Sequence, residues 1–173
     1  MGKPMKTRIL SAAVVAALML AGAPAQAAPR IGQPAPPLQT TLLDGRTFDL
    51  GQARGKVVIV SLWATWCTPC RLEMPILDQA RTRYGAEGLE VVGLSADRPK
   101  SREDVARVMQ SVGYPTGMAL ETKMNGFGVP RALPQTFVID RQGVVRAEFG
   151  VLGDPVTEAR LEAVLGPLLA VTR

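Results

Sequence analysis

LWATWCTPCRLEMP, the stretch from Leu62 to Pro75, contains both cysteines of the chain, Cys67 and Cys70. It overlaps the end of VVIVSLW, residues 57 to 63. This run is rich in β-branched side chains and is apolar at both odd and even positions. That pattern is typical of a central strand covered on both faces of a sheet. The cysteine pair therefore follows closely on a predicted buried strand.

A helix is expected after the cysteines, from Arg71 to Tyr84. Its inner face is predicted from the near-helical spacing of Leu72, Ile76, Leu77 and Ala80. Pro75 removes one backbone hydrogen bond and should kink the helix without ending it, because the pattern continues beyond it. Gly85 stands where the helix should stop. The two cysteines thus lie at the junction of a strand and a helix.

The rest of the chain alternates predicted strands and helices. In order these are a hairpin around Asp44-Gly45, a strand over 90–95, a helix capped by Ser101, an irregular segment over 113–131 with at most one short strand at 118–120, a hairpin of strands 136–140 and 144–149, and a last helix starting at Asp154. Such alternation indicates an α/β fold with a central mixed β-sheet flanked by helices on both faces.

Residues 1–27 have the features of a secretory signal peptide. Three basic residues precede an apolar run over 9–23, and the small-x-small site Ala25-Gln26-Ala27 follows it. A retained membrane anchor is the alternative, but a spanning helix needs about 20 apolar residues. We expect cleavage after Ala27, which leaves residues 28–173 as a single domain and makes the periplasm the expected location, where disulfides persist.

The charge balance gives little basis for binding nucleic acid. The chain has 20 Lys and Arg against 15 Asp and Glu, but three of the basic residues lie in the expected signal peptide. No run of cations and no aromatic-basic stripe remains in residues 28–173. We therefore expect no nucleic-acid partner.

The positions of Cys67 and Cys70 predict a redox-active dithiol. At the start of a helix, free backbone N–H groups and the positive end of the helix dipole favour the thiolate of Cys67. Cys70 lies one turn further on, close enough to attack a mixed disulfide and release the partner. Pro69 fits the first turn, where its missing N–H costs nothing.

Two alternative roles for the cysteine pair are a zinc site and a purely structural disulfide. A zinc site needs about four ligands, but the chain has no histidine and no third cysteine. A purely structural disulfide would close a loop of a few residues and constrain the unfolded chain little. We expect the disulfide of Cys67 and Cys70 to be the redox group, with no bound cofactor and no required metal.

WATWCTPC, with VVIVSL before it and RLEMP after it, resembles the TlpA/ResA-like branch of the thioredoxin superfamily, a group of exported thiol-disulfide oxidoreductases. IGQPAPPLQTTLLDGRTFDL resembles the N-terminal extension of that family, and ALPQTFVID resembles its segment with a cis-proline. The resemblance implies a thioredoxin fold with an N-terminal β-hairpin extension. It also implies that Cys67 attacks, that Cys70 resolves, and that the cis-proline, Pro134, lies against the disulfide.

A physical argument also supports a cis-proline role for Pro134. An X-Pro bond adopts the cis form at modest cost, and a proline that opens a strand leaves a backbone edge for an incoming peptide. The alternative is an ordinary trans proline at the start of a strand. We expect the neighbouring Leu133, together with Trp66, Thr68 and Pro69, to contact the substrate.

Glu73 is the expected proton partner of the dithiol. Thioredoxins proper keep a buried aspartate in the strand before the cysteines, but this chain has Ser61 at that position. The resemblance places a glutamate three residues after the second cysteine, and Glu73 stands there, one helical turn from Cys70. Burial would raise the pKa of Glu73 and allow proton exchange with Cys70. The alternative is a solvated first-turn glutamate.

Other residues near the motif have weaker signals. Trp63 and Trp66 are expected to pack around the site, although either could belong to the core alone. Arg71 and Arg131 could place positive charge near the thiolate, but charged side chains at such positions are usually only solvated.

The resemblance implies that the protein reduces disulfides of protein partners, such as those of apocytochrome c or of copper-site assembly proteins, with electrons from a membrane thiol donor. We expect it to act as a monomer. A peroxiredoxin-like peroxidase is an alternative, since its reactive cysteine also follows a threonine, here Thr65. A thioredoxin-like copper-binding assembly protein is another, although the lack of histidine disfavours it. A third is an inert binding module.

Overall fold

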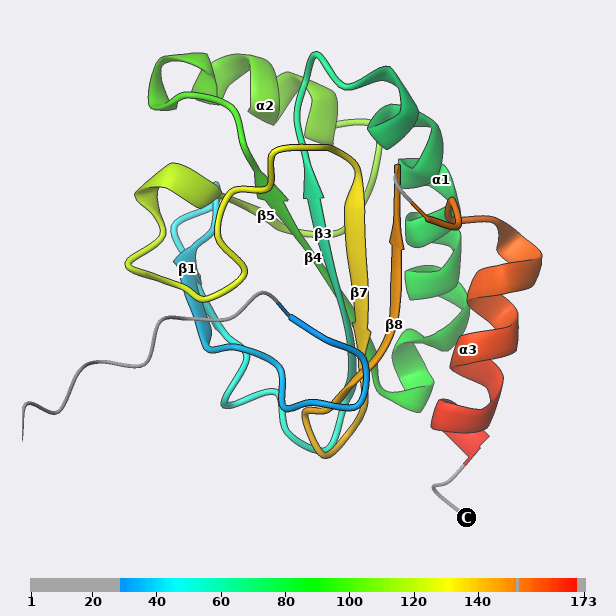
Figure 1. Cartoon of the computed structure of the whole chain (residues 1–173). Coiled ribbons are helices and arrows are strands. Elements are labelled where there is room, and N and C mark those ends of the chain that lie inside the picture. The colour runs from blue at the N-terminus through cyan, green and yellow to red at the C-terminus, as the bar shows by residue number, and fades with distance from the viewer. Residues whose placement is uncertain (1–28, 152, 171–173) are drawn as a thin grey trace, which may run out of the picture.

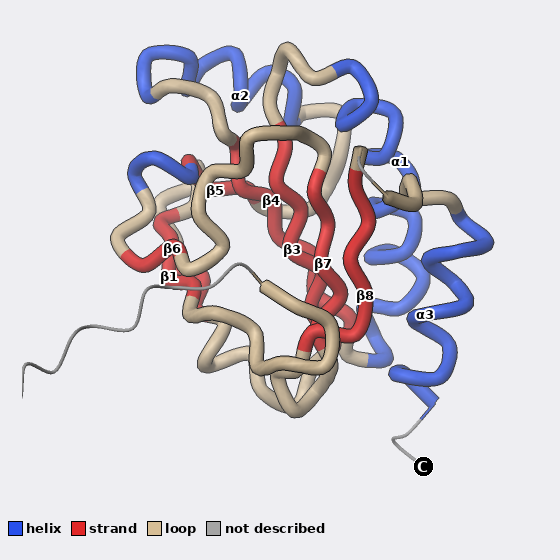
Figure 2. Tube along the Cα trace, in the orientation of Figure 1, coloured by secondary structure: helices blue, strands red, loops and turns tan. Residues whose placement is uncertain are grey.

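The computed structural model describes residues 29–151 and 153–170, and the expected signal peptide lies outside them. Five strands form the central sheet in the order β5-β4-β3-β7-β8. They are β3 (Val57–Trp63), β4 (Leu89–Ser95), β5 (Thr116–Met118), β7 (Gln135–Ile139) and β8 (Val145–Gly150). β3, β4 and β5 are parallel, whereas β7 is antiparallel to β3 and β8 (Figure 1, Figure 2). The predicted mixed sheet is confirmed.

β3 has the bounds that the sequence predicted, and all of its residues are buried. Its alternating side chains enter two separate core clusters, one on each face of the sheet. Trp63 pairs with Ser95 of β4, and Leu62 pairs with Gln135 of β7. The carboxyl ends of β3 and β4 and the amino end of β7 therefore meet at one edge of the sheet, which we call the carboxyl edge.

The helices are α1 (Thr68–Tyr84), α2 (Arg102–Met109) and α3 (Glu158–Ala170). α1 and α3 lie side by side on one face of the sheet (Figure 1), where the Tyr84 hydroxyl donates a hydrogen bond to Glu162. Buried side chains of all three helices belong to the same core cluster. In the described ranges, no helix combines the length and the hydropathy needed to cross a membrane.

The second face of the sheet is covered mainly by the N-terminal extension. Its strands β1 (Leu38–Thr41) and β2 (Thr47–Asp49) form the predicted antiparallel hairpin, and β6 (Met124–Asn125) pairs with β1. Gly45 supplies the positive φ of +85° that the turn requires. Within the described residues, the helical cover of this face is the short 3-10 turn Ala119–Glu121, whose Ala119 is buried there. The three α-helices bury their residues on the other face, whereas the sequence predicted helices on both faces.

The inner face of α1 differs from the prediction. The helix begins at Thr68, not at Arg71, because Cys67 caps it. Leu72, which was expected to point inward, is 71% exposed, whereas Glu73 and Met74 are buried. The buried face follows Cys70, Met74 and Leu77, so the contact of Cys70 with the core sets the rotation of the helix. α1 continues through Pro75 as predicted.

Three other boundaries also differ. Ser101 makes no capping hydrogen bond with its side chain, because it ends a 3-10 turn, Pro99–Ser101, that leads into α2. The strand expected at 118–120 lies at Thr116–Met118, and a second short strand, β6, follows it. Both strands depend on pairing with distant segments, which local patterns do not encode. The last helix begins at Glu158 instead of Asp154.

Candidate active site

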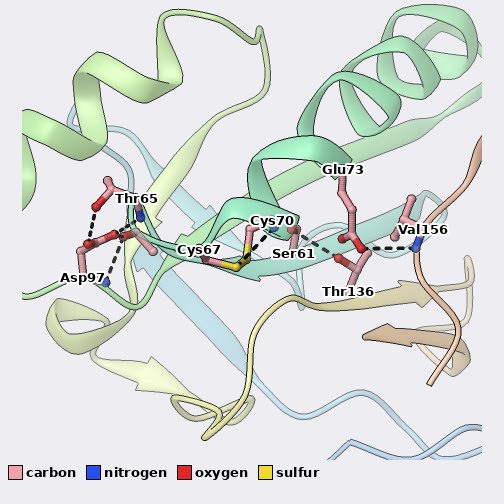
Figure 3. The surroundings of a disulfide bond; sticks show 9 residues. Ser61, Thr65, Cys67, Cys70, Glu73, Asp97, Thr136 and Val156 are labelled. Carbon is pink, nitrogen blue, oxygen red and sulfur yellow. Dashed lines mark hydrogen bonds between the residues drawn. A yellow bond between two sulfur atoms is a disulfide. The ribbon is translucent and has the colours of Figure 1, made fainter. Parts of the chain in front are cut away.

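Cys67 and Cys70 form a disulfide at the start of α1, on the carboxyl edge (Figure 3). β3 ends at Trp63, and the short connection that follows brings Cys67 to the N-cap of the helix. The backbone N–H of Cys70 donates to Cys67 Sγ at 3.3 Å. Pro69 occupies the first turn, where it removes no helical hydrogen bond. The arrangement gives Cys67 the backbone donor that was expected from the sequence.

The disulfide lies just below the surface, beside exposed residues. Cys67 is 4% exposed and Cys70 is 2% exposed, whereas Trp66 is 70% exposed. Thr68 and Pro69 are exposed as well. Trp63 is part of the core, and its indole N–H donates to Thr116 Oγ1 at 3.2 Å. A partner would therefore meet Trp66, Thr68 and Pro69 before it reaches the sulfur atoms.

Pro134 lies at the same edge, immediately before β7. The peptide bond between Leu133 and Pro134 is cis, as the resemblance implied. The carbonyl of Pro134 accepts a hydrogen bond from the N–H of Val151 at 3.3 Å, and Leu133 packs against both core clusters. The antiparallel pairing of β7 with β3 therefore brings a segment far along the chain to the strand end that leads to the cysteines.

Glu73 is buried, with 6% of its surface exposed, so it is not the solvated first-turn glutamate of the alternative. Its Oε1 accepts a hydrogen bond from the N–H of Val156 at 3.3 Å (Figure 3). Burial raises the pKa of Glu73 to about 6, and the hydrogen bond from Val156 opposes this rise only in part. Glu73 thus titrates close to neutral pH, one helical turn from Cys70.

Ser61 takes the place of the buried acid of thioredoxins and carries no titratable group. It is buried on β3, and its Oγ accepts a hydrogen bond from Thr136 Oγ1 of β7 at 3.3 Å. This neutral pair fills the position with hydroxyl groups. The buried ionisable group nearest to Cys70 along α1 is Glu73, one helical turn away.

Asp97 is a residue that the sequence reasoning missed. Its buried carboxylate follows β4 and accepts hydrogen bonds from the Thr65 N–H at 2.8 Å, the Thr65 hydroxyl at 2.7 Å and the Ser95 hydroxyl at 2.8 Å (Figure 3). The sequence offered one indication of this role. Asp97 follows the predicted strand over 90–95, and the parallel strand β3 next to it ends at the same level and leads to the cysteines. Asp97 fixes the connection that carries Trp66 and Cys67.

Replacement of Asp97 by Ala should destabilise the protein by about 1–3 kcal/mol, because the half-buried donors of Thr65 and the buried hydroxyl of Ser95 lose their acceptor. Urea unfolding of the oxidised protein measures the change. As a control, Asp104→Ala removes an exposed carboxylate that pairs with Arg107 on α2, and we expect it to cost no more than about 1 kcal/mol. Equal effects of the two replacements would contradict the role given to Asp97.

Comparisons with known proteins agree with this geometry. The model of the AhpC/TSA family matches residues 31–148. Thiol-disulfide oxidoreductase ResA of Bacillus cereus is 31% identical over 136 residues, which are 79% of this chain and 77% of the relative. Thiol:disulfide interchange protein DsbE of Yersinia pestis is 33% identical over 138 residues, or 76% of this chain and 70% of the relative.

A solved structure supports the fold. The thiol:disulfide interchange protein of the thioredoxin family from Chlorobium tepidum superposes with a TM-score of 0.65 at 28% identity. The match covers 83% of this chain and 99% of the other. The thioredoxin fold predicted from the sequence is thereby confirmed.

Proposed function

This chain belongs to the AhpC/TSA family and is a thiol-disulfide oxidoreductase of the ResA/DsbE type, and from that premise we propose that it reduces disulfides of exported protein partners. The observation that carries the proposal is the Cys67–Cys70 disulfide at the start of α1, with an N–H donor on Cys67 Sγ and a buried acid one turn away. The relatives are named as disulfide oxidoreductases and interchange proteins, which supports a protein disulfide as the substrate.

The proposed reaction has two exchanges. In the reduced protein, the Cys67 thiolate attacks one sulfur of the partner disulfide; that S–S bond breaks, a mixed disulfide forms, and the released partner thiolate takes a proton. Cys70 then loses its proton to Glu73 and attacks Cys67 of the mixed disulfide. The bond between Cys67 and the partner breaks as the Cys67–Cys70 disulfide forms, and the second partner thiolate takes a proton, so the partner leaves as a dithiol. A thiol donor returns two electrons to restart the cycle.

We propose the periplasm as the location, with residues 1–27 as a cleaved signal peptide and residues 28–173 as the mature domain. A membrane thiol protein would supply the electrons. The substrates would be apocytochrome c or copper-site assembly proteins, which the resemblance to the TlpA/ResA-like branch supports. The protein would act as a monomer, with its own disulfide as the redox group and no bound cofactor.

Titration of the dithiol against glutathione tests the direction of transfer. We expect a reduction potential close to or below that of thioredoxin, about −270 mV. Equilibrium mixtures are quenched with acid, and the thiol content is measured by alkylation and mass spectrometry. A strongly oxidising potential, near the value of about −120 mV known for DsbA, would overturn the proposed role as a reductant.

The geometry at Thr65 does not favour a peroxidase. That alternative rests on the threonine two residues before Cys67, but both the hydroxyl and the N–H of Thr65 are engaged by Asp97. Figure 3 shows Thr65 and Asp97 together, apart from the sulfur atoms. Thr65 therefore stabilises the loop that precedes the cysteines.

A further inference from the structure

The carboxyl edge carries four cations that make no ion pair with any described residue. They come from the segments that surround the disulfide, and all are exposed: Arg71, Arg98, Lys100 and Arg131. Most other cations of the described chain are paired, as Arg102 is with Glu121 and Arg160 with Asp154. We call these four residues the basic rim.

The backbone places the basic rim on the segments next to Cys67. Arg71 donates its N–H to the carbonyl of Cys67, so it lies one turn along α1 from the sulfur. The hydrogen bonds of Asp97 to Thr65 hold Arg98, the next residue, beside the connection that carries Trp66. Lys100 follows in the short turn before α2. Arg131 lies three residues before Pro134 in the segment that leads into β7, and β7 neighbours β3 on the side away from β4.

The exposed acids of the neighbouring segments make no ion pair with the basic rim. Glu121 and Asp154 are already paired with Arg102 and Arg160. Glu103 and Glu158 lie in the first turns of α2 and α3, where the positive ends of the helix dipoles attract them. Glu148 accepts a hydrogen bond from Gln135. Each cation of the basic rim is therefore left without an acidic partner among the described residues.

Two large apolar side chains are exposed next to the disulfide in the sequence. Trp66 is 70% exposed and Leu72 is 71% exposed, one on each side of the disulfide in the sequence. An exposed tryptophan within a polar rim is the arrangement that protein interfaces use for their central contacts. Leu72, which should have been buried by its sequence pattern, is thus available to a partner.

We propose that the carboxyl edge binds partners whose reactive cysteine lies in an acidic polypeptide segment. Trp66 and Leu72 pack against the partner beside its cysteine, and the basic rim faces its Asp and Glu side chains. The inference rests on the proposed disulfide exchange at Cys67 and adds the chemistry of the partner to it. Complementary charge at such a site raises the rate of encounter more than the strength of the complex.

Peptides cyclised by one disulfide test this proposal. Three peptides of equal length carry Glu, Gln or Lys beside their cysteines, and the reduced protein is mixed with each in a stopped-flow instrument. Their rates with dithiothreitol correct for intrinsic reactivity. At low ionic strength we expect the Glu peptide to react about tenfold faster than the Gln peptide, and the Lys peptide to react slowest. High salt should remove the difference.

Charge-reversal variants test whether the basic rim causes the preference for the Glu peptide. Arg98→Glu and Lys100→Glu should each lower the preference for the Glu peptide severalfold, since they invert charges of the basic rim. Arg54→Glu is the matched control, because Arg54 is exposed, makes no ion pair in the described chain, and precedes the amino end of β3 at the other end of the strand. It should leave the preference unchanged.

The possible outcomes distinguish failure of this proposal from failure of the proposed disulfide reduction. Equal corrected rates for the three peptides would overturn the acidic partner and leave disulfide reduction intact. Failure to reduce any peptide would contradict the proposed function itself. If the variants lose binding to vesicles of anionic lipid but keep the same rates with all peptides, the basic rim serves a membrane surface and the proposal is wrong.

Discussion

Replacement of Cys67 by Ser is expected to reduce disulfide exchange to the uncatalysed rate, whereas Cys70→Ser should stop the reaction at the mixed disulfide. Cys67 receives the N–H of Cys70 and stands at the N-cap of α1, so it is the sulfur that the helix stabilises as a thiolate. Without Cys70 the first exchange proceeds but nothing releases the partner. Insulin reduction measures turnover, and non-reducing electrophoresis with mass spectrometry detects the trapped complex.

The two variants control for each other. Both lose a crosslink between cysteines three positions apart, which stabilises the protein by about 2 kcal/mol at most in the chain-entropy estimate for so short a loop. A difference between them therefore reports the roles of the two sulfur atoms and not the loss of the bond. Accumulation of the mixed disulfide in Cys67→Ser, and not in Cys70→Ser, would reverse the assignment of attacker and resolver.

The parts of the fold that depend on local pattern were predictable. β3 was found residue for residue, because a strand buried on both faces reads as an unbroken apolar run. The Asp44-Gly45 hairpin followed from the turn residues themselves. The strands β5 and β6 were not placed correctly, since each is short and exists through pairing with a distant strand. Similarly, α3 starts late because the Thr157 hydroxyl, just before it, accepts a hydrogen bond from the N–H of Arg160 and caps the helix there.

The candidate site also contains some residues that could be predicted from the sequence and others that could not. The positions of Cys67, Cys70 and Pro134 could be read from a motif and a resemblance, and their arrangement at one edge follows from the sheet topology. Asp97 could not be assigned, since its partners lie at the end of another strand. Leu72 was misplaced for a related reason: the spacing of apolar residues in α1 does not reveal that Cys70 and Glu73 occupy the buried side.

The wild type should lose stability between acid and neutral pH, and Glu73→Gln should remove this loss. Burial raises the pKa of Glu73 from 4.5 to about 6, so between these values the folded protein holds a proton that the unfolded chain has lost. The free energy of unfolding therefore falls as the pH rises through this window, by about 2 kcal/mol in total. Gln stays neutral at every pH and can still accept from Val156, so the variant should lack this loss.

Urea unfolding of the oxidised proteins at pH 4 and pH 7 measures the effect as a difference between variant and wild type. Glu87→Gln is the control, because Glu87 is an exposed acid outside the site. An equal difference at the two pH values for Glu73→Gln would show that the carboxyl group titrates normally, and the proton role would then lose its basis.

The same substitution should change the kinetics of the second exchange. Above pH 6 the carboxylate of Glu73 can take the proton of Cys70, so the release of a partner from Cys67 should accelerate through this pH in the wild type. Glu73→Gln should lack that rise and release the partner about a hundredfold more slowly at pH 7. Single-turnover decay of a preformed mixed disulfide isolates the step. A merely structural role for Glu73 would leave the shape of the pH profile unchanged, because Gln fills the same space and keeps the bond to Val156; loss of the rise near pH 6 therefore identifies a proton transfer.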